Sequence, residues 1–164
     1  MYFFSSSAGV YNATKQKETV VEALKESDAY PAEPEDGYGW EKLVSERMCR
    51  HFTEDFGLQT RVLRYHNVYG PEGTYDGGRE KAPAAIGRTI VNAKLKTITT
   101  LDVWGDGEQT SSFMYIDDCL TGNKMVFNSN PTDVDTLGSD EQVSINQVIA
   151  LIEDTADHNR RLHA

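Results

Sequence analysis

Apolar residues recur along this chain with two periods, one typical of helices and one typical of strands. The pattern predicts helices over about 38–56, 82–93, 117–127 and 144–156, and strands at 1–4, 58–65, 101–104, 112–115 and 134–137. Gly57 is the expected cap at the end of the first helix, and Pro83 would stand in the first turn of the second. Asp117 and Ser144 are the expected N-caps of the last two helices. Strands alternating with helices predict an α/β fold.

Charge and hydropathy limit the possible partners and location. The formal net charge of the 164 residues is -10, which argues against nucleic acid or an acidic membrane surface as a partner. No run approaches the roughly 18 apolar residues of a membrane span. The N-terminus lacks the basic segment and the apolar run of a signal peptide. A cytoplasmic location is therefore expected.

Cysteine and histidine show no metal-binding pattern. Two cysteines, Cys49 and Cys119, form neither a ligand cluster nor a disulfide framework, so each is expected to be a small packing residue. The spacing of the histidines does not suit a metal either. They are His51, His66, His158 and His163. His51 is expected on the exposed face of the first helix.

A tyrosine and a lysine form the most informative pair in the chain. Tyr38 and Lys42 are four residues apart at the start of a predicted helix, so they share one face of it. A free tyrosine has a pKa of about 10, and a neighbouring ammonium favours its phenolate, which can act as a general base. A serine hydroxyl from the strand end at Ser5-Ser6-Ser7 could complete the site. The alternative is an amphipathic surface pair without a catalytic role.

The order of the motifs raises this pair above chance. The first strand ends in Ser5-Ser6-Ser7-Ala8-Gly9-Val10-Tyr11, the Tyr38 helix follows, and a later strand runs into Arg64-Tyr65-His66-Asn67-Val68-Tyr69-Gly70-Pro71. This series resembles the extended short-chain dehydrogenase/reductase family of NAD-dependent epimerases and dehydratases. Its members carry Ser-Ser-x-x-x-Tyr, Tyr-x-x-x-Lys and Arg-x-x-Asn-x-Tyr-Gly-Pro in this order. The resemblance implies the C-terminal part of a doubly wound, Rossmann-like parallel sheet plus a small α/β substrate-binding lobe.

Within that family, the GDP-mannose 3,5-epimerase branch fits best. Its resemblance runs from Phe3 to about Asn146 and is carried by the stretches 25–34, 77–85 and 104–110. The stretch from Gly77 to Ala85 is the most specific to this branch. The resemblance implies an isomerase that holds NAD and acts on a GDP-sugar, and a homodimer when the protein is full-length.

The resemblance also implies roles for individual residues. Tyr38 would deprotonate the sugar 4-hydroxyl, Lys42 would hold the nicotinamide ribose of NAD and lower the pKa of Tyr38, and Ser7 would bind the reacting hydroxyl. Oxidation at C4 acidifies the protons on C3 and C5, and Lys81 matches one member of the pair that inverts these carbons. A solvated lysine at a helix start is the alternative for Lys81.

The cofactor-binding positions that the resemblance implies are Tyr38, Lys42, Tyr65 and His66. The substrate-binding positions are Ser7, Ala8, Gly9, Asn67, Glu80, Lys81, Ala82, Gln109 and Ser111.

Three positions depart from the branch. Gly9 stands where the 3,5-epimerases carry the cysteine that partners the lysine, and glycine has no proton to transfer. Ser111 replaces an arginine that pairs with the diphosphate, and Thr89 replaces a lysine that contacts substrate. Losing two cations should weaken the binding of an anionic sugar nucleotide. Losing a catalytic proton donor typically costs on the order of 10²–10⁴ in rate.

The glycine fingerprint of a dinucleotide-binding domain does not precede these motifs. The nearest candidate, Gly70-Pro71-Glu72-Gly73, has Asp76 at the third glycine position and is therefore interpreted as a turn. The chain is accordingly expected to be a fragment. Residues 1–70 would be the second half of an NAD-binding domain, and 71–164 mainly the substrate lobe, with a returning strand-helix segment and a truncated C-terminus. Alone, it is expected not to hold NAD.

Three functional hypotheses follow from the sequence. The first is an NAD-dependent sugar-nucleotide epimerase of the GDP-mannose 3,5-epimerase type, with reduced or altered chemistry. The second is a C4 epimerase or dehydratase that keeps Ser7, Tyr38 and Lys42 and needs no cysteine at position 9. The third is a non-catalytic truncated homologue.

Overall fold

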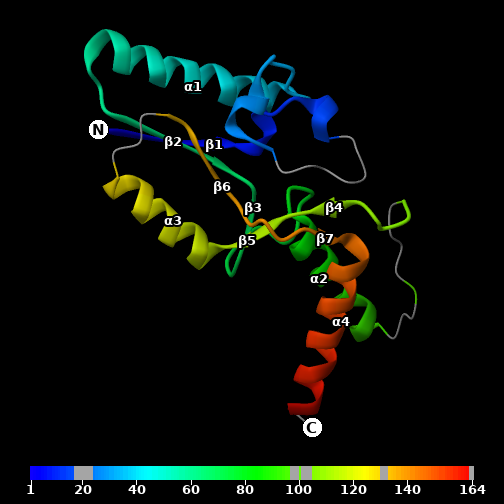
Figure 1. Cartoon of the computed structure of the whole chain (residues 1–164). Coiled ribbons are helices and arrows are strands. Elements are labelled where there is room, and N and C mark those ends of the chain that lie inside the picture. The colour runs from blue at the N-terminus through cyan, green and yellow to red at the C-terminus, as the bar shows by residue number, and fades with distance from the viewer. Residues whose placement is uncertain (17–23, 97–99, 101–104, 130–132, 163–164) are drawn as a thin grey trace. The chain divides into compact units, whose positions relative to one another are not determined.

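The computed structural model describes residues 1–16, 24–96, 100, 105–129 and 133–162, with the backbone alone for 157–162. The chain forms two compact units. The first unit contains residues 1–68 and 112–140, and the second contains 69–111 and 141–164. Figure 1 labels the helices and strands of both units.

The first unit is built on a parallel sheet with the strand order β1-β2-β6. Its strands are β1 (Tyr2–Ser7), β2 (Thr60–Tyr65) and β6 (Asp135–Leu137). Helices α1 (Gly37–Phe56) and α3 (Ile116–Asn128) cover opposite faces of this sheet (Figure 1). A parallel sheet with a helix on each face confirms the predicted α/β fold class.

The described part of the connection between β1 and α1 contains three short 3-10 helices. They are η1 (Ala8–Val10), η2 (Ala13–Gln16) and η3 (Glu26–Ala29). Val10, Tyr11 and Ala29 from this connection form a buried cluster with Leu43 of α1. This cluster holds the start of α1 against the residues that follow β1, where the predicted catalytic side chains lie.

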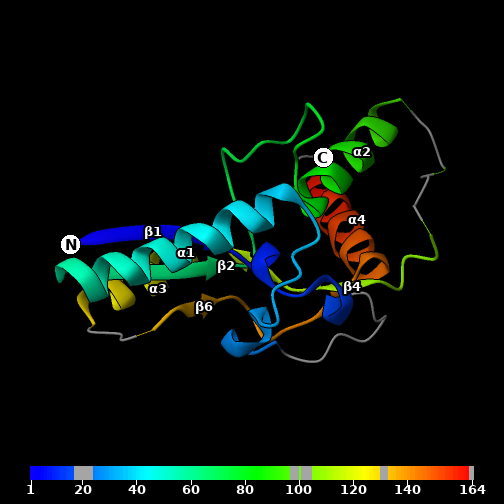
Figure 2. The same cartoon turned by 90° about the horizontal axis from the view of Figure 1, so that it is seen from above.

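The second unit contains two long helices, α2 (Ala82–Leu95) and α4 (Ile145–Leu162), which lie side by side (Figures 1 and 2). A short antiparallel pair joins β4 (Thr110–Ser111) to β7 (Val143–Ser144). A further two-stranded sheet, which belongs to the first unit except for Tyr69, pairs β3 (Asn67–Tyr69) with β5 (Phe113–Tyr115). The strand predicted at 101–104 lies outside the described residues.

Two of the three predicted helix caps are confirmed. Gly57 follows α1 with a left-handed φ of 65°, and its amide donates to the Phe52 and Thr53 carbonyls. The Ser144 hydroxyl accepts from the Gln147 amide at 3.2 Å, and the Gln147 side chain accepts from the Ser144 amide at 2.8 Å. These reciprocal bonds make a capping box at the start of α4.

The prediction that Asp117 is an N-cap is wrong. Helix α3 starts at Ile116, its cap residue is Tyr115, and Asp117 and Asp118 lie inside the first turn. Acidic residues are favourable there as well, because the helix N-terminus carries partial positive charge. The sequence alone therefore does not separate a cap from a first-turn acid. Helix α4 also continues beyond the predicted end near residue 156, to Leu162.

One face of α1 carries apolar side chains that the first unit leaves exposed. The exposed residues are Trp40, Val44, Met48, Phe52 and Phe56. The buried positions of the helix lie on another face and include Leu43, Glu46 and Cys49. The helical period predicted from the apolar residues is right, but most of these residues face away from the core of the unit.

Candidate active site

The first turn of α1 holds the predicted general base. The Asp36 carboxylate accepts from the Gly39 amide at 2.8 Å and starts the helix at Gly37. Tyr38 therefore stands in the first turn, and Lys42 follows one turn later on the same side. The Lys42 ammonium nitrogen lies 5.4 Å from the centroid of the Tyr38 ring. About half of the Tyr38 surface is exposed.

Lys42 is also tied to the end of β1. Its ammonium donates to the Ser5 carbonyl at 3.0 Å and lies 5.1 Å from the centroid of the Phe4 ring. An ammonium has three N–H donors, so the Ser5 contact leaves capacity for a ligand. The cation is thus fixed between the strand end and the Tyr38 ring.

Ser7 lies at the last position of β1. Its hydroxyl oxygen accepts from the Gly9 amide at 3.1 Å, and the hydroxyl proton can therefore be donated elsewhere. A Cβ added at Gly9 would lie 3.5 Å from Ser7 Oγ and 3.7 Å from Tyr38 Cδ1. The structure thus brings Ser7, Gly9 and Tyr38 together, and Ala8 begins the turn between the first two.

Gly39 was not singled out in the sequence, but the site depends on it. A Cβ at this position would overlap the Gly9 carbonyl oxygen and would lie 2.8 Å from Pro34 Cβ. Only glycine lets the first turn of α1 approach the backbone of Gly9 this closely. The available signal was a glycine inside the first turn of a predicted helix, beside Tyr38, where helix propensity disfavours it.

Three further predicted residues lie where β2 ends and β3 begins. The Tyr65 hydroxyl donates to the Asn123 side chain, and burial raises the pKa of Tyr65, which keeps the phenol protonated. Burial lowers the pKa of His66, so its ring is neutral near pH 7, with Nδ1 3.5 Å from Ser112 Oγ. The Asn67 amide donates to the Ser112 carbonyl at 3.2 Å.

The remaining predicted residues belong to the second unit. Lys81 is exposed and precedes α2 as its cap residue without a side-chain cap bond, and Ala82 is the first residue of that helix. One oxygen of Glu80 accepts from Arg88 at 2.8 Å, whereas Oε2 is buried without a hydrogen-bond partner among the described residues.

The positions expected to contact the nucleotide diphosphate and substrate lie on other elements of the second unit. The Gln109 carbonyl accepts from the Ile145 amide at 3.2 Å. Ser111 pairs with Val143 in the β4–β7 ladder. The Thr89 hydroxyl donates to the Ala85 carbonyl at 2.8 Å, inside its own helix.

A sequence model of the NAD dependent epimerase/dehydratase family matches residues 1–136. The chain belongs to this family. It is 48% identical over 163 residues to GDP-mannose 3,5-epimerase 1 of Oryza sativa subsp. indica, an alignment that covers 99% of this chain and 42% of the rice protein. This member of the epimerase/dehydratase family thus spans about two fifths of the length of that relative.

Solved structures of epimerases share the fold of this epimerase/dehydratase family member. UDP-N-acetylglucosamine 4-epimerase from Methanobrevibacter ruminantium M1, in complex with UDP-N-acetylmuramic acid, aligns with a TM-score of 0.81 at 26% identity, covering 94% of this chain and 46% of that one. UDP-glucuronic acid 4-epimerase from Bacillus cereus, in complex with UDP-glucuronic acid and NAD, aligns with a TM-score of 0.76 at 28% identity, covering 94% and 45%.

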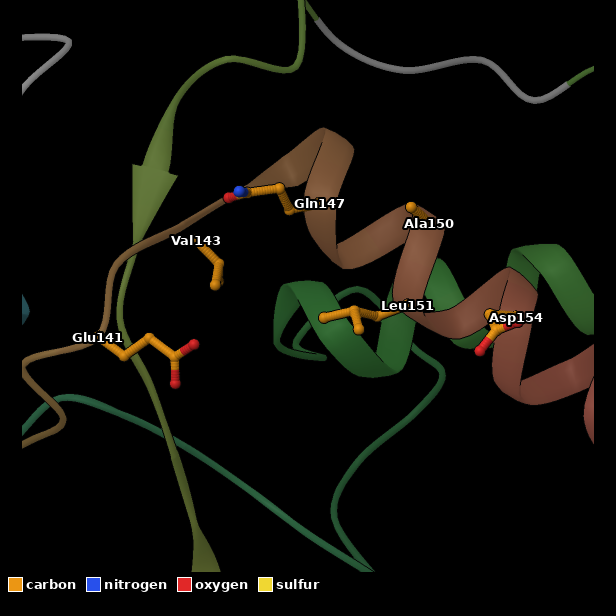
Figure 3. A pocket seen from close by; sticks show the side chains of 6 residues that line it. All are labelled: Glu141, Val143, Gln147, Ala150, Leu151 and Asp154. Atoms are coloured by element: carbon orange, nitrogen blue, oxygen red, sulfur yellow. The ribbon is translucent and has the colours of Figure 1, made fainter.

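An open hollow in the second unit has none of the predicted site residues in its lining, although Val143 of this lining pairs with Ser111. Figure 3 shows its lining, which comes from α4 and the residues before it: Glu141, Val143, Gln147, Ala150, Leu151 and Asp154. None of these residues was expected to contact cofactor or substrate. The hollow is a surface feature with apolar walls and two carboxylates, and it gives no support to a catalytic role.

The other exclusions concern metals and membranes. Among the described residues, no group of three or more His, Cys, Asp or Glu could hold a metal ion. Cys49 and Cys119 are free and buried, as the packing prediction requires, and burial raises the pKa of both thiols. His51 is exposed as predicted, whereas the side chains of His158 and His163 lie outside the described residues. No described helix is long and apolar enough to cross a membrane.

Proposed function

We propose that the protein containing this chain is an NAD-dependent sugar-nucleotide epimerase of the GDP-mannose 3,5-epimerase type. The observation that carries the proposal is the cluster of Ser7, Tyr38 and Lys42, in which the lysine ammonium lies 5.4 Å from the tyrosine ring centroid. The 48% identity to the rice enzyme supports the choice of GDP-mannose as substrate.

The three side chains can perform proton transfer at one sugar hydroxyl. Ser7 would donate a hydrogen bond to that oxygen, since its own oxygen already accepts from Gly9. Tyr38, as the phenolate, would take the hydroxyl proton and become neutral, and the Lys42 ammonium would stabilise the phenolate before the transfer. Because Ser5 holds the lysine, the charge is in position before substrate arrives.

These residues fit a nicotinamide cofactor. Lys42 keeps ammonium donors for the ribose hydroxyls, and the neutral ring of His66 together with Tyr65 would form part of the wall of the cofactor site. NAD, when bound, supplies the hydride acceptor for C4 of the sugar. In the same proposal residues 1–70 contribute to cofactor binding and 71–164 mainly to substrate binding.

Inversion at C3 and C5 requires a second proton-transfer group, and we assign this role to Lys81. Protons next to a carbonyl are acidic enough for a lysine amine to remove. Glu80, which accepts from Arg88 through Oε1, would contribute to sugar binding. Ala8, Gly9, Asn67, Ala82, Gln109 and Ser111 would complete the substrate contacts.

A C4 epimerase or dehydratase is the second candidate, and Gly9 favours it. Glycine supplies no proton for a second inversion, whereas Ser7, Tyr38 and Lys42 are sufficient for chemistry at C4. Thr89 and Ser111, in place of two cations, do not separate the two candidates, because both act on an anionic sugar nucleotide.

The exposed apolar face of α1 supports a homodimer of the whole protein. Contiguous apolar side chains on a helix surface are typical of protein interfaces. A cytoplasmic location fits the two free cysteines, which are buried thiols rather than a disulfide.

The test is to express the longest reading frame that contains this chain and to assay it with GDP-mannose for C3/C5 inversion and for bound NAD. Retained NAD with inversion supports the first candidate. Retained NAD without inversion favours chemistry at C4 alone. If the protein holds no NAD and shows no turnover, the third hypothesis, a non-catalytic homologue, remains.

A pair of matched variants tests the catalytic assignment in that assay. Tyr38→Phe should reduce turnover by about 10²–10⁴, because it removes only the proton-accepting oxygen. Tyr2→Phe removes the same atom from a tyrosine at the opposite end of β1 and should leave turnover unchanged. Equal effects of the two variants would exclude Tyr38 as the base.

A further inference from the structure

A buried ion pair joins α1 to β2 beneath the candidate site. Arg64 Nε lies 3.0 Å from Glu46 Oε1, and Arg64 Nη2 lies 2.7 Å from Glu46 Oε2, so the contact is bidentate. Only 3% of each side chain is exposed. Burial alone would lower the pKa of Arg64, but the Glu46 carboxylate raises it overall, so the guanidinium remains charged.

The same carboxylate also binds β1. The Ser6 hydroxyl donates a short hydrogen bond to Glu46 Oε1. Ser6 and Arg64 are direct neighbours in the parallel β1–β2 register, so one carboxylate bonds to both strands at a single level of the sheet. The other side of Arg64 is held by the Glu26 carbonyl at 2.8 Å and by the Tyr11 ring at 5.1 Å.

Thermodynamic stability is a weak explanation for this arrangement. Removing two charges from water costs several kcal/mol per ion, and apolar replacements for buried ion pairs are often as stable or more stable. What a fully bonded buried pair provides is a single geometry, since any sliding of the helix would break its hydrogen bonds. The pair therefore fixes the position of α1 along the strands.

The positions of these residues connect the pair to the site. Ser6 lies between Ser5, whose carbonyl holds Lys42, and Ser7, whose hydroxyl borders the space at Gly9 that Tyr38 Cδ1 also borders. Glu46 follows Lys42 by four residues, one turn further along the same helix. A displacement of Glu46 would therefore move both Lys42 on α1 and Ser7 on β1.

We propose that Glu46 is a positioning residue for the reaction, holding Tyr38 and Lys42 of α1 in place against Ser7 of β1 through its bonds to Ser6 and Arg64. This inference rests on the proposed function. It adds a role for Ser6, Glu46 and Arg64, none of which was expected to touch cofactor or substrate.

The test uses Ser6→Ala in the longest reading frame that contains this chain. Glu46→Gln is unsuitable alone, because it leaves a buried guanidinium without its counter-charge and is expected to unfold the protein. Ser6→Ala removes one hydroxyl and keeps the ion pair. The matched control is Thr53→Val, which also removes a hydroxyl contact of α1 with the sheet. This contact joins Thr53 to Thr60 of β2 at 2.8 Å, at the far end of the helix.

Two readouts separate positioning from general stability. The first is hydrogen exchange of the Gly9 amide, which donates to Ser7 and so reports the strand end with or without catalysis. We expect exchange to be about tenfold faster in Ser6→Ala than in Thr53→Val, which corresponds to a local loss of about 1.4 kcal/mol. The second is turnover, for which kcat should fall about 10- to 100-fold in Ser6→Ala with KM unchanged.

The two proposals can fail separately. If the parent protein neither holds NAD nor turns over, the proposed function is wrong, and Gly9 exchange alone decides the positioning role. A Gly9 exchange rate that is unchanged, or raised equally by both variants, would overturn that role whether or not the protein is an enzyme. Faster exchange in Ser6→Ala alone, with reduced kcat in an active parent, would support both.

Discussion

Two positions of the candidate site lack a side chain, Gly9 and Gly39, and the structure gives them different requirements. At Gly39 an added Cβ would overlap the backbone of Gly9, whereas at Gly9 it would meet its neighbours at ordinary contact distances of 3.5 to 3.9 Å. Gly39 is therefore needed by the fold. In the described structure no close contact requires glycine at position 9. The effect of Gly9 is on the chemistry, because it supplies no group that can transfer a proton.

Gly39→Ala should destabilise the protein by about 1–3 kcal/mol, because the methyl group overpacks the contact between α1 and the Gly9 turn. Urea unfolding followed by circular dichroism measures this loss. Gly37→Ala is the control, since an added Cβ there meets nothing within 4 Å. It should be neutral or stabilising by about 0.5 kcal/mol. Similar losses in both variants would show that the close approach at Gly39 is not what matters.

Gly9→Cys should fold as well as the parent and should raise C3/C5 inversion if the protein is a 3,5-epimerase. The thiol would enter the space beside Ser7 and Tyr38 and supply a group that can transfer a proton, an effect worth on the order of 10²–10⁴ in rate. Product analysis with GDP-mannose measures it. Gly9→Ala fills the same space without a transferable proton, so an equal gain in that variant would contradict the argument.

Individual contacts were predicted from the sequence only where local spacing determines them. The Tyr38–Lys42 contact follows from one helical turn, and the motif order identified Ser7. The Ser6–Glu46–Arg64 network was not predicted, because its members are separated by up to 58 residues and no local period links them. The buried Glu80 oxygen was not predicted for the same reason, since burial depends on long-range packing.

At the scale of elements, the capping box of α4 gives a testable energy. Ser144→Ala removes the bond to the Gln147 amide and should destabilise the start of α4 by about 0.5–2 kcal/mol. Hydrogen exchange of the first-turn amides of α4 measures the change locally. Ser45→Ala is the control, because among the described residues that hydroxyl bonds only to the Glu41 carbonyl within α1. Its loss should cost little, and a comparable effect would argue against capping.

Element types were predictable wherever a strong period or a special residue marked them. Gly57 ended α1 because a left-handed residue was required there, and Pro83 marked the start of α2. The N-cap of α3 was misplaced by two residues, at Asp117 instead of Tyr115, since an acidic residue is favourable in the first turn as well as at the cap. Patterns alone did not assign which face of α1 is buried, because its apolar stripe is wider than the contact that the first unit offers.

At the scale of the whole molecule, the division into two units is not a simple cut of the chain. Residues 112–140 return to the first unit, where β6 pairs with β2 in parallel, and Leu63, Arg64 and Tyr65 lie opposite 135–137. The motif resemblance predicted a returning strand-helix segment within 71–164, without its bounds. Composition could not have done so, because strand pairing across some 70 residues leaves no local signal.

Met48→Glu should convert a dimer of the longest reading frame into monomers. Met48 is 53% exposed at the middle of the apolar face of α1, and burying an unpaired carboxylate in an interface there is costly. We expect the dissociation constant of the dimer to rise by at least about 100-fold, as for a central interface residue. Light scattering across a dilution series measures the dissociation constant.

The control variant is Leu120→Glu, which places the same charge on a 49% exposed apolar residue of α3 and should leave the dimer intact. A parent that is monomeric at every concentration, or equal dissociation in both variants, would mean that the apolar face of α1 is not the dimer interface.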